Sequence, residues 1–312
     1  MRFIMKTGMV ILLWAGSVLA QVNHNGGLAG AFLRVGLGGR SMAMGNVGVA
    51  MPAGAYAFYG NPALTAVDNR RVAALMGHFM ALDRYAYFAG FTTPIPGGAG
   101  VSAAWLSSGT GNLHAYNTIG EDTGELNHSM HALYGTFARS FGKFRVGVSI
   151  KMVLEYLNDG TSEFDYAAQA VGGDAGIYYA WNEDLAFGVA VDNIGVQLKA
   201  NTEKIFTRGG NTQFSLPLMI KAGAFYRTPL RWLRVAYETV SSNGVHFDHR
   251  MGMEALYGEN IALRLGHTGH NFTFGAGMDF KFMDLVSYLD YVYSASVVDE
   301  GAGHLFSWQF FF

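Results

Sequence analysis

The chain has 312 residues, of which half are hydrophobic, 14% aromatic and only 14% charged, whereas about 25% is typical of soluble domains. The formal net charge of −2 offers no basic footprint for a nucleic acid. Because the chain has no cysteine, disulfides, thiolate metal sites, thiol nucleophiles and a lipid-modified cysteine anchor are excluded.

The first twenty residues predict a secretory signal peptide. Arg2 and Lys6 form a positive region, Met9–Ala15 is a short apolar run, and Val18–Ala20 offers small residues for cleavage after Ala20. The run is too short for a bilayer, which requires about 20 apolar residues. A permanent N-terminal anchor is the alternative. No later segment approaches the length of a membrane helix, so a membrane-bound form would be a closed β-barrel. A large soluble β protein is its rival.

Residues 21–68 predict a segment that precedes the regular part of the chain. Gly26–Ala66 is rich in glycine and alanine and does not alternate cleanly. Small residues allow close packing of one backbone against another. We expect a plug that folds into the mouth or the lumen of the barrel. Asn61–Ala63 is a turn signal, because proline fixes φ and removes a hydrogen-bond donor.

From about Arg71 onward the hydrophobic pattern has a period of two, as in a pleated strand. In Phe272–Phe282 the phenylalanines and Met278 share one face, and polar or small residues share the other. Residues 69–312 thus predict an all-β transmembrane antiparallel barrel of about 14 strands. The strands are expected to begin near Arg71, Tyr85, Gly100, His131, Lys143, Gln169, Leu185, Leu216, Leu233, Phe247, Ile261, Asn271, Leu285 and Leu305.

The connections between these strands alternate in character. Short turns such as Phe141–Lys143 and Tyr257–Asn260 alternate with connections that are usually longer and more polar, of which Ser107–Ser129 is the longest and Ile194–Ser215 another. Bacterial outer-membrane barrels have short periplasmic turns and long outer loops. The expected location is therefore the bacterial outer membrane, after export with a cleaved signal peptide.

Charged residues recur on the polar faces of several strands. A charge on the lipid face costs about 2–4 kcal/mol at the midplane for Arg or Lys, so these residues are expected to line the lumen. Their mixed signs favour an ion-paired, hydrated interior over a strongly selective pore. The expected lumen residues are Arg145, Lys151, Glu155, Lys221, Arg234, Glu238, Arg250, Glu254, Arg264, Asp279 and Lys281.

The chain ends on an alternating aromatic strand. Phe306, Trp308, Phe310 and Phe312 share one face. An exposed terminus usually frays and is polar, whereas a last strand that closes a barrel places such a face against lipid. These four residues predict the C-terminal assembly signal that barrel assembly machinery recognises.

No motif indicates an enzyme. Gly36-x-Gly38-Gly39 lacks the preceding strand and the spacing of a nucleotide loop. His267 and His270 have no third ligand nearby in the sequence, and no G-x-S-x-G is present. We therefore expect no catalytic residue, no metal and no cofactor.

Three N-terminal motifs, Ala29–Gly36, Gly39–Gly45 and Tyr59–Ala63, resemble the opening of the PorV/PorQ family of bacterial outer-membrane proteins, which is related to the FadL-type transporters. A weaker resemblance continues through the strands and includes Val191–Gly195. It implies a 14-stranded barrel with an N-terminal plug. Where the family has an acidic pair, Met51–Ala55 has no acid. The plug residues on which the resemblance rests are Arg34, Gly36, Arg40, Met44, Gly45, Asn61, Pro62 and Ala63.

The resemblance implies transport across the outer membrane or an accessory role in type IX-like protein secretion. The alternatives are a FadL-type uptake channel for hydrophobic small molecules and a structural or adhesive barrel whose outer loops bind partners. The expected partners are outer-membrane lipid and barrel assembly machinery, with secreted cargo, secretion-machinery proteins or a hydrophobic small molecule according to the role. No nucleic acid is expected.

Overall fold

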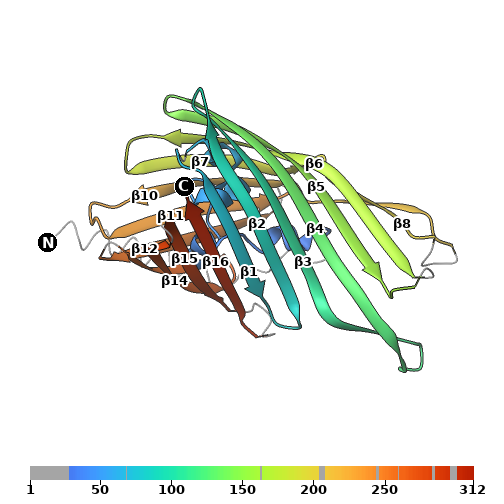
Figure 1. Cartoon of the computed structure of the whole chain (residues 1–312). Coiled ribbons are helices and arrows are strands. Elements are labelled where there is room, and N and C mark those ends of the chain that lie inside the picture. The colour runs from blue at the N-terminus through green and yellow to red at the C-terminus, as the bar shows by residue number, and fades with distance from the viewer. Residues whose placement is uncertain are drawn as a thin grey trace.

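The computed structural model describes residues 28–67, 69–161, 164–203, 208–243, 246–258, 260–282, 285–295 and 301–312. The expected signal peptide and its cleavage site lie outside these residues. Within them, sixteen strands form one sheet, and five short helical turns precede it (Figure 1).

Fourteen strands close into an antiparallel barrel, which confirms the predicted fold class. β16 pairs with β1 from Phe311 opposite Val72 to His304 opposite Phe79, and β5 pairs with β6, so the sheet has no open seam (Figure 1). The barrel strands are β1 Val72–Phe79, β2 Arg84–Ile95, β3 Ala99–Tyr116, β4 Asp122–Phe141, β5 Phe144–Asn158, β6 Asp165–Ala180, β7 Leu185–Ile194, β10 Met219–Arg227, β11 Leu233–Ser242, β12 His246–Tyr257, β13 Ile261–His267, β14 Phe272–Phe282, β15 Leu285–Ser294 and β16 Gly303–Phe311.

Two regions that we expected to be loops are largely strands. Most of Ser107–Ser129 is the hairpin of β3 and β4, in which only residues 117–121 form the turn. Within Ile194–Ser215, β8 (Gln197–Asn201) and β9 (Asn211–Ser215) form a further hairpin, and β8 also pairs with β6. The β3–β4 extension is mostly polar, and β8 and β9 have only five residues each, although β8 alternates between exposed and buried side chains; periodicity therefore did not reveal them.

The barrel has two distinct ends. The turn end carries the short connections at residues 96–98, 142–143, 181–184 and 228–232, and the connection after β12. The hairpin end carries the β3–β4 turn, the β8–β9 hairpin and the connections after β11 and β13. β3 and β4 are the longest strands, with 18 and 20 residues, so one side of the hairpin end extends well beyond the other.

Residues 28–67 fold inside the barrel and form the plug. Its helical turns are η1 Ala31–Arg34, α2 Gly39–Ala43, η2 Gly54–Tyr56, α3 Ala57–Gly60 and η3 Pro62–Ala66. They lie within the ring of strands (Figure 1). All are five residues or shorter, and their burial against the wall rather than helix propensity stabilises them.

Candidate functional site: the plug and its cavities

Asn61 joins the plug to the barrel wall at the turn that the sequence singled out. Its side chain has no exposed surface, and its amide nitrogen donates to the carbonyl oxygens of Val49 at 2.8 Å and Ile177 at 2.9 Å. Its amide oxygen accepts from the backbone nitrogen of Ala63 at 3.0 Å and so caps η3. Pro62 follows as the first residue of this turn, where its missing N–H costs no hydrogen bond.

The wall has no side chain where Asn61 and Pro62 approach it. Gly147 of β5 and Gly176 of β6 are paired across the sheet. A Cβ on Gly176 would overlap the amide oxygen of Asn61, and one on Gly147 would overlap the backbone of Pro62 and Ala63. The plug therefore packs directly on the backbone of the sheet, which requires glycine at both positions.

Met44 and Gly45 make a similar contact on the opposite wall. A Cβ on Gly252 of β12 would overlap the carbonyl oxygen of Met44, and one on Gly266 of β13 would overlap the nitrogen of Gly45. Gly45 has a φ of 75° and donates to the Thr273 hydroxyl at 3.1 Å. The Met-Gly motif is thus the point where the chain turns against bare sheet backbone.

Arg40 on α2 forms the ion pair that links the plug to the wall. Its Nε and Nη2 each donate to Glu254 of β12 at 2.8 Å, a bidentate pairing. Glu254 also accepts from Arg234 of β11 at 2.9 Å and from Arg264 of β13 at 2.8 Å, and it is 1% exposed. Three guanidinium groups therefore surround one buried carboxylate.

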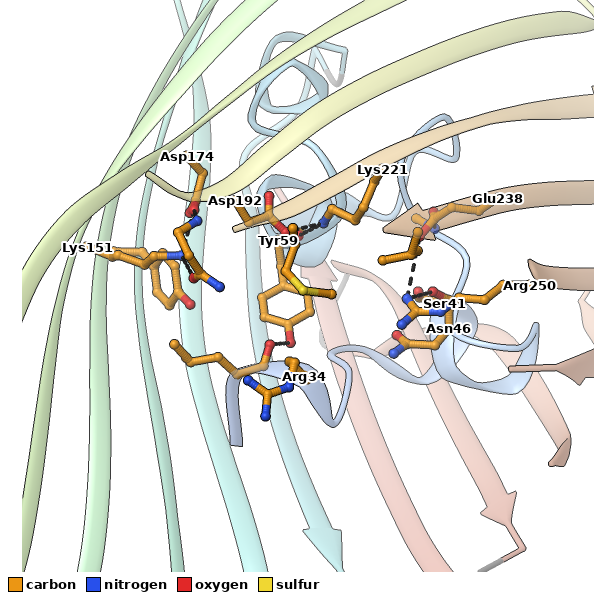
Figure 2. A pocket seen from close by; sticks show the side chains of 17 residues that line it. Arg34, Ser41, Asn46, Tyr59, Lys151, Asp174, Asp192, Lys221, Glu238 and Arg250 are labelled. Carbon is orange, nitrogen blue, oxygen red and sulfur yellow. Dashed lines mark hydrogen bonds and ion pairs between the residues drawn. The ribbon is translucent and has the colours of Figure 1, made fainter. Parts of the chain in front are cut away.

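The other buried charges pair mainly within the wall (Figure 2). Lys151 contacts Asp174 at 2.5 Å, and Lys221 contacts Asp192 at 2.7 Å. Lys221 also donates to the carbonyl oxygen of Tyr59 at 3.0 Å. Each pair joins two neighbouring strands of the wall. These lumen charges are therefore neutralised within the wall, without a charged residue of the plug.

Glu238 of β11 anchors the plug through the plug's backbone. Its Oε2 accepts from the nitrogens of Gly48 and Val49, both at 2.8 Å, and its Oε1 lies 3.5 Å from Arg250 of β12. Arg250 in turn donates to the carbonyl oxygen of Asn46 at 3.2 Å. The two residues thus hold the Asn46–Val49 segment from one side (Figure 2).

Three cavities border the plug. The hairpin-end cavity, of about 330 Å³, has Arg34, Asn46, Asp248, Arg250 and His270 in its lining. A smaller cavity of about 50 Å³ shares Arg34, Asn46 and Arg250 with it (Figure 2). The turn-end cavity, of about 370 Å³, lies on the other side of the plug and includes Arg40 and Glu254. The plug therefore separates a polar cavity at each end.

The plug also belongs to two separate apolar clusters. The larger cluster joins residues such as Phe58 and Leu64 to the inner faces of β1–β7, β15 and β16. The smaller one contains Met44, Val47, Val49, Ala50 and Met51, which pack against Ala190, Phe225 and Ala236 of β7, β10 and β11. The larger apolar cluster therefore lies toward β1–β7, β15 and β16, whereas the contacts of the plug with Glu238, Arg250 and Glu254 lie toward β11 and β12.

Arg34 and Gly36 lie near the start of the plug. Arg34 donates to the carbonyl oxygens of Ala29 at 3.0 Å and Leu28 at 3.2 Å, and a Cβ on Gly36 would overlap the side chain of Asn46. The hydroxyl of Tyr59 donates to the carbonyl oxygen of Leu33. Burial raises the pKa of Tyr59 well above its ordinary value, so it remains a donor at neutral pH.

The remaining nominated charges lie near the barrel ends. Arg145 packs over the ring of Tyr178 at 5.2 Å, and Glu155 lies 3.6 Å from His128. Asp279 lines the turn-end cavity, while Lys281 is exposed at the end of β14. All of them share the face of their strand that alternates toward the lumen. Phe306, Trp308, Phe310 and Phe312 occupy the opposite face of β16 or follow it, with Phe306 and Phe312 exposed.

Sequence reasoning missed the acidic partners of the lumen lysines and arginines. Asp174, Asp192 and Asp290 were not nominated, although each is buried or half-buried on the inner face. Asn193 has a φ of 64° and binds Lys151 and Asp174. Asp192 and Asn193 belong to the motif Val191–Gly195, and the inner-face rule applied to β6 and β15 would have found the other two.

The described residues contain no group of three or more His, Asp or Glu side chains that could hold a metal ion. His267 accepts from the nitrogen of Gly269, and His270 lies 3.4 Å from Asp248, so the two histidines have separate partners. In the described part of the chain, no helix is long and apolar enough to cross a membrane.

Comparison with known proteins identifies the fold and leaves the family open. No protein-family model matches the sequence, and no curated protein does. The toluene transporter TodX of Pseudomonas putida matches with a TM-score of 0.64 and 13% identity, over 89% of this chain and 99% of that one. The toluene transporter TbuX of Ralstonia pickettii matches with a TM-score of 0.62 and 15% identity, over 89% and 98%.

A FadL homologue of Pseudomonas aeruginosa matches with a TM-score of 0.58 and 11% identity, over 88% of this chain and 97% of that one. Identities this low establish a common fold. The chain therefore has a FadL-like fold, an all-β antiparallel barrel of fourteen strands with a short helical N-terminal segment.

Proposed function

We propose that this protein is an outer-membrane channel that admits hydrophobic small molecules. The observation that carries the proposal is the combination of a closed fourteen-strand barrel and an internal plug, matched along nearly the full length of proteins described as toluene transporters. The FadL-type uptake channel is therefore favoured over a role in protein secretion.

The outer surface of the barrel supports a membrane location. Residues that alternate away from the lumen are large and apolar, for example Val148, Ile150 and Leu263, which are 57%, 64% and 56% exposed. Aromatic rings gather toward both ends of this surface. Phe144 stacks on Tyr179 near the turn end, with ring centroids 4.4 Å apart, and Tyr291 contacts His304 near the hairpin end. An apolar band between two aromatic girdles is typical of membrane barrels.

An apolar groove on the outer wall offers such molecules a place to bind beside the plug. Phe137, Val148 and Ile177 line this groove, which has a volume of about 460 Å³, and its floor is the Gly147–Gly176 pair. Asn61 and Pro62 of the plug lie directly behind that floor. Nearby, the register between β6 and β7 shifts between Gly173 and Ala175. Only sheet backbone therefore separates the plug from the lipid face at this position.

The membrane location is tested by placing a charge on the apolar band. Ile150→Lys is expected to lower the stability of the barrel in lipid by about 2–4 kcal/mol, because a lysine would face hydrocarbon. Unfolding in urea from phospholipid vesicles measures the change. Lys281→Gln, at an exposed strand end, is the control and should change little. An unaffected Ile150→Lys protein would indicate a soluble barrel.

Uptake is tested with radiolabelled toluene in cells that carry or lack the gene. We expect several-fold slower uptake at low micromolar concentration in the deletion strain, restored by the wild-type gene, with unchanged entry of a sugar. Equal uptake of toluene and of a longer alkane in the two strains would overturn the proposal.

A role as an accessory of type IX-like secretion is the second candidate, favoured by the Gly39–Gly45 and Tyr59–Ala63 motifs. That role predicts that deletion removes cargo proteins from the cell surface while hydrocarbon uptake stays normal. An adhesive role would instead depend on the β3–β4 hairpin, and removing residues 117–121 would abolish partner binding.

A further inference from the structure

The lining of the turn-end cavity has the composition of a ligand site. Its lining contains five arginines, Arg40, Arg70, Arg227, Arg234 and Arg264, and three carboxylates, Glu254, Asp279 and Asp290. The lining thus carries two more positive charges than negative ones. A cavity of about 370 Å³ lies within the size range of small-molecule sites, about 300–1,000 Å³.

In this cavity the accepting capacity of Glu254 is filled. Glu254 accepts four hydrogen bonds at 2.8–2.9 Å from three arginines, which fills the roughly four lone-pair sites of a carboxylate. Arg40 donates Nε and Nη2 to Glu254 and Nη1 to the carbonyl oxygen of Pro52 at 2.8 Å, which leaves one N–H on each of its terminal nitrogens for a ligand. Arg234 reaches Glu254 through Nη1, and its side chain remains 31% exposed toward the cavity. A guanidinium carries five N–H groups in a planar fork that matches a second carboxylate.

One wall of the same cavity is aromatic. The rings of Tyr288 and Phe311 meet edge to face with their centroids 4.8 Å apart, and the Arg70 guanidinium lies 4.2 Å from the centre of the Phe311 ring. Both rings line the cavity together with Leu256 and Ile261. An aromatic ring can pack here in an offset or edge-to-face arrangement.

We propose that the turn-end cavity binds a small aromatic carboxylate, with the carboxylate on Arg234 and Arg40 and the ring against Tyr288 and Phe311. Neither feature alone selects this class. The excess positive charge selects an anion, and the Tyr288–Phe311 wall selects a ring over a short acid. Because Arg40 is also the plug's ion-pairing residue, such a ligand would share a guanidinium with Glu254.

That this ligand is also a transported solute rests on the proposed uptake function. Binding is therefore measured separately from transport. Purified protein in detergent micelles is titrated with benzoate, benzyl alcohol and acetate by isothermal calorimetry. We expect saturable binding of benzoate, with at least tenfold weaker binding of the other two. Retained benzoate binding together with failed toluene uptake would overturn the uptake proposal and leave the site intact.

Two variants and a matched control complete the test. Arg234→Gln keeps a polar side chain of similar length and should weaken benzoate binding by about tenfold or more, because one charge-assisted contact is lost. Phe311→Leu should weaken benzoate and leave acetate unchanged. Arg145→Gln removes an inner-face arginine outside this cavity, packed on Tyr178, and should have no effect.

Benzoate binding no tighter than that of benzyl alcohol would overturn the site, and so would equal losses in the Arg234→Gln and Arg145→Gln proteins. Far-ultraviolet circular dichroism and the heat-dependent mobility of each variant establish that it forms the barrel. A variant that does not fold is replaced by Arg234→Lys, which retains the charge without the fork and should still weaken binding.

Discussion

The two sides of the plug are fastened to the barrel by different interactions. On the side of β1–β6, Phe58, Leu64 and their neighbours form the large apolar cluster. On the side of β10–β14, the plug is held by contacts of Arg40 with Glu254, of Gly48 with Glu238 and of Gly45 with Thr273, together with a much smaller apolar cluster. The first side depends mainly on buried area, which is not directional, with the Asn61 amide adding a hydrogen bond to β6. The second depends mainly on a few directional contacts that single substitutions can remove.

The charged side is arranged so that the wall retains its own charge balance. Arg234 and Arg264 still compensate Glu254 and Asp290 without any help from Arg40. Substitution of Arg40, or movement of the plug away from the wall, would therefore leave no buried carboxylate of this cluster unpaired. Loss of Glu254 has the opposite consequence, because three guanidiniums would lose their common partner.

Glu254→Ala is expected to have the largest effect on the charged side. Removing one partner of a buried ion pair typically costs about 3–5 kcal/mol, and Glu254 is 1% exposed. Urea unfolding from vesicles, followed by tryptophan fluorescence, measures the loss of stability. Glu155→Ala is the control, since Glu155 is partly exposed and faces only His128 at 3.6 Å, and it should cost at most about 1 kcal/mol. Similar losses for both would show that the Glu254 cluster does not hold the structure.

Gly176→Ala is expected to weaken the packing of the plug against β5 and β6. The new methyl group would overlap the Asn61 amide, and overpacking of this kind costs about 1–3 kcal/mol. The same unfolding assay applies. The matched control is Gly135→Ala on β4, where a Cβ would meet only Ile150 at 3.5 Å, an ordinary contact. A harmless Gly176→Ala would contradict direct packing of the plug on the wall.

Asn61→Ala removes a capping oxygen and an amide that binds two carbonyl groups. The expected cost is about 1–3 kcal/mol, because buried backbone groups lose partners. We also expect ion leakage through planar bilayers to increase as the plug loosens. A protein with unchanged stability and no leakage would reduce Asn61 to an ordinary turn residue.

Pro62→Ala should have the smallest effect, about 1 kcal/mol or less. Pro62 makes its contribution mainly by restricting the unfolded chain, and alanine can adopt the same backbone angles. Bilayer conductance should remain near the wild-type value. A larger loss than that of Asn61→Ala would show that the proline ring, rather than the asparagine amide, seats the plug.

The sequence allowed most of the barrel to be predicted, because an apolar outer face and a more polar lumen face impose a period of two on each strand. Eleven of the fourteen expected strand starts lie within two residues of those observed. The exceptions begin near His131, Gln169 and Leu216. At His131 the period failed because β4 begins nine residues earlier, in a polar extension.

The site was predictable only in part. Arg40, Glu254 and Asn61 were nominated singly, but their partners were not, since Arg40 and Glu254 are 214 residues apart in sequence. Periodicity places a residue on a face and says nothing about which residue of another strand it meets. The cavities likewise depend on how the plug crosses the lumen, which a glycine-rich stretch without a regular period does not encode.

Hydrogen exchange of the plug tests the two-sided attachment most directly. Mass spectrometry of peptides covering residues 39–51 and 57–66 would compare wild type with Glu254→Ala and Gly176→Ala. We predict that Glu254→Ala accelerates exchange mainly in residues 39–51 and Gly176→Ala mainly in residues 57–66, because each attachment opens locally. Equal acceleration of both peptides in both variants would show a plug that moves as one unit and would contradict this account.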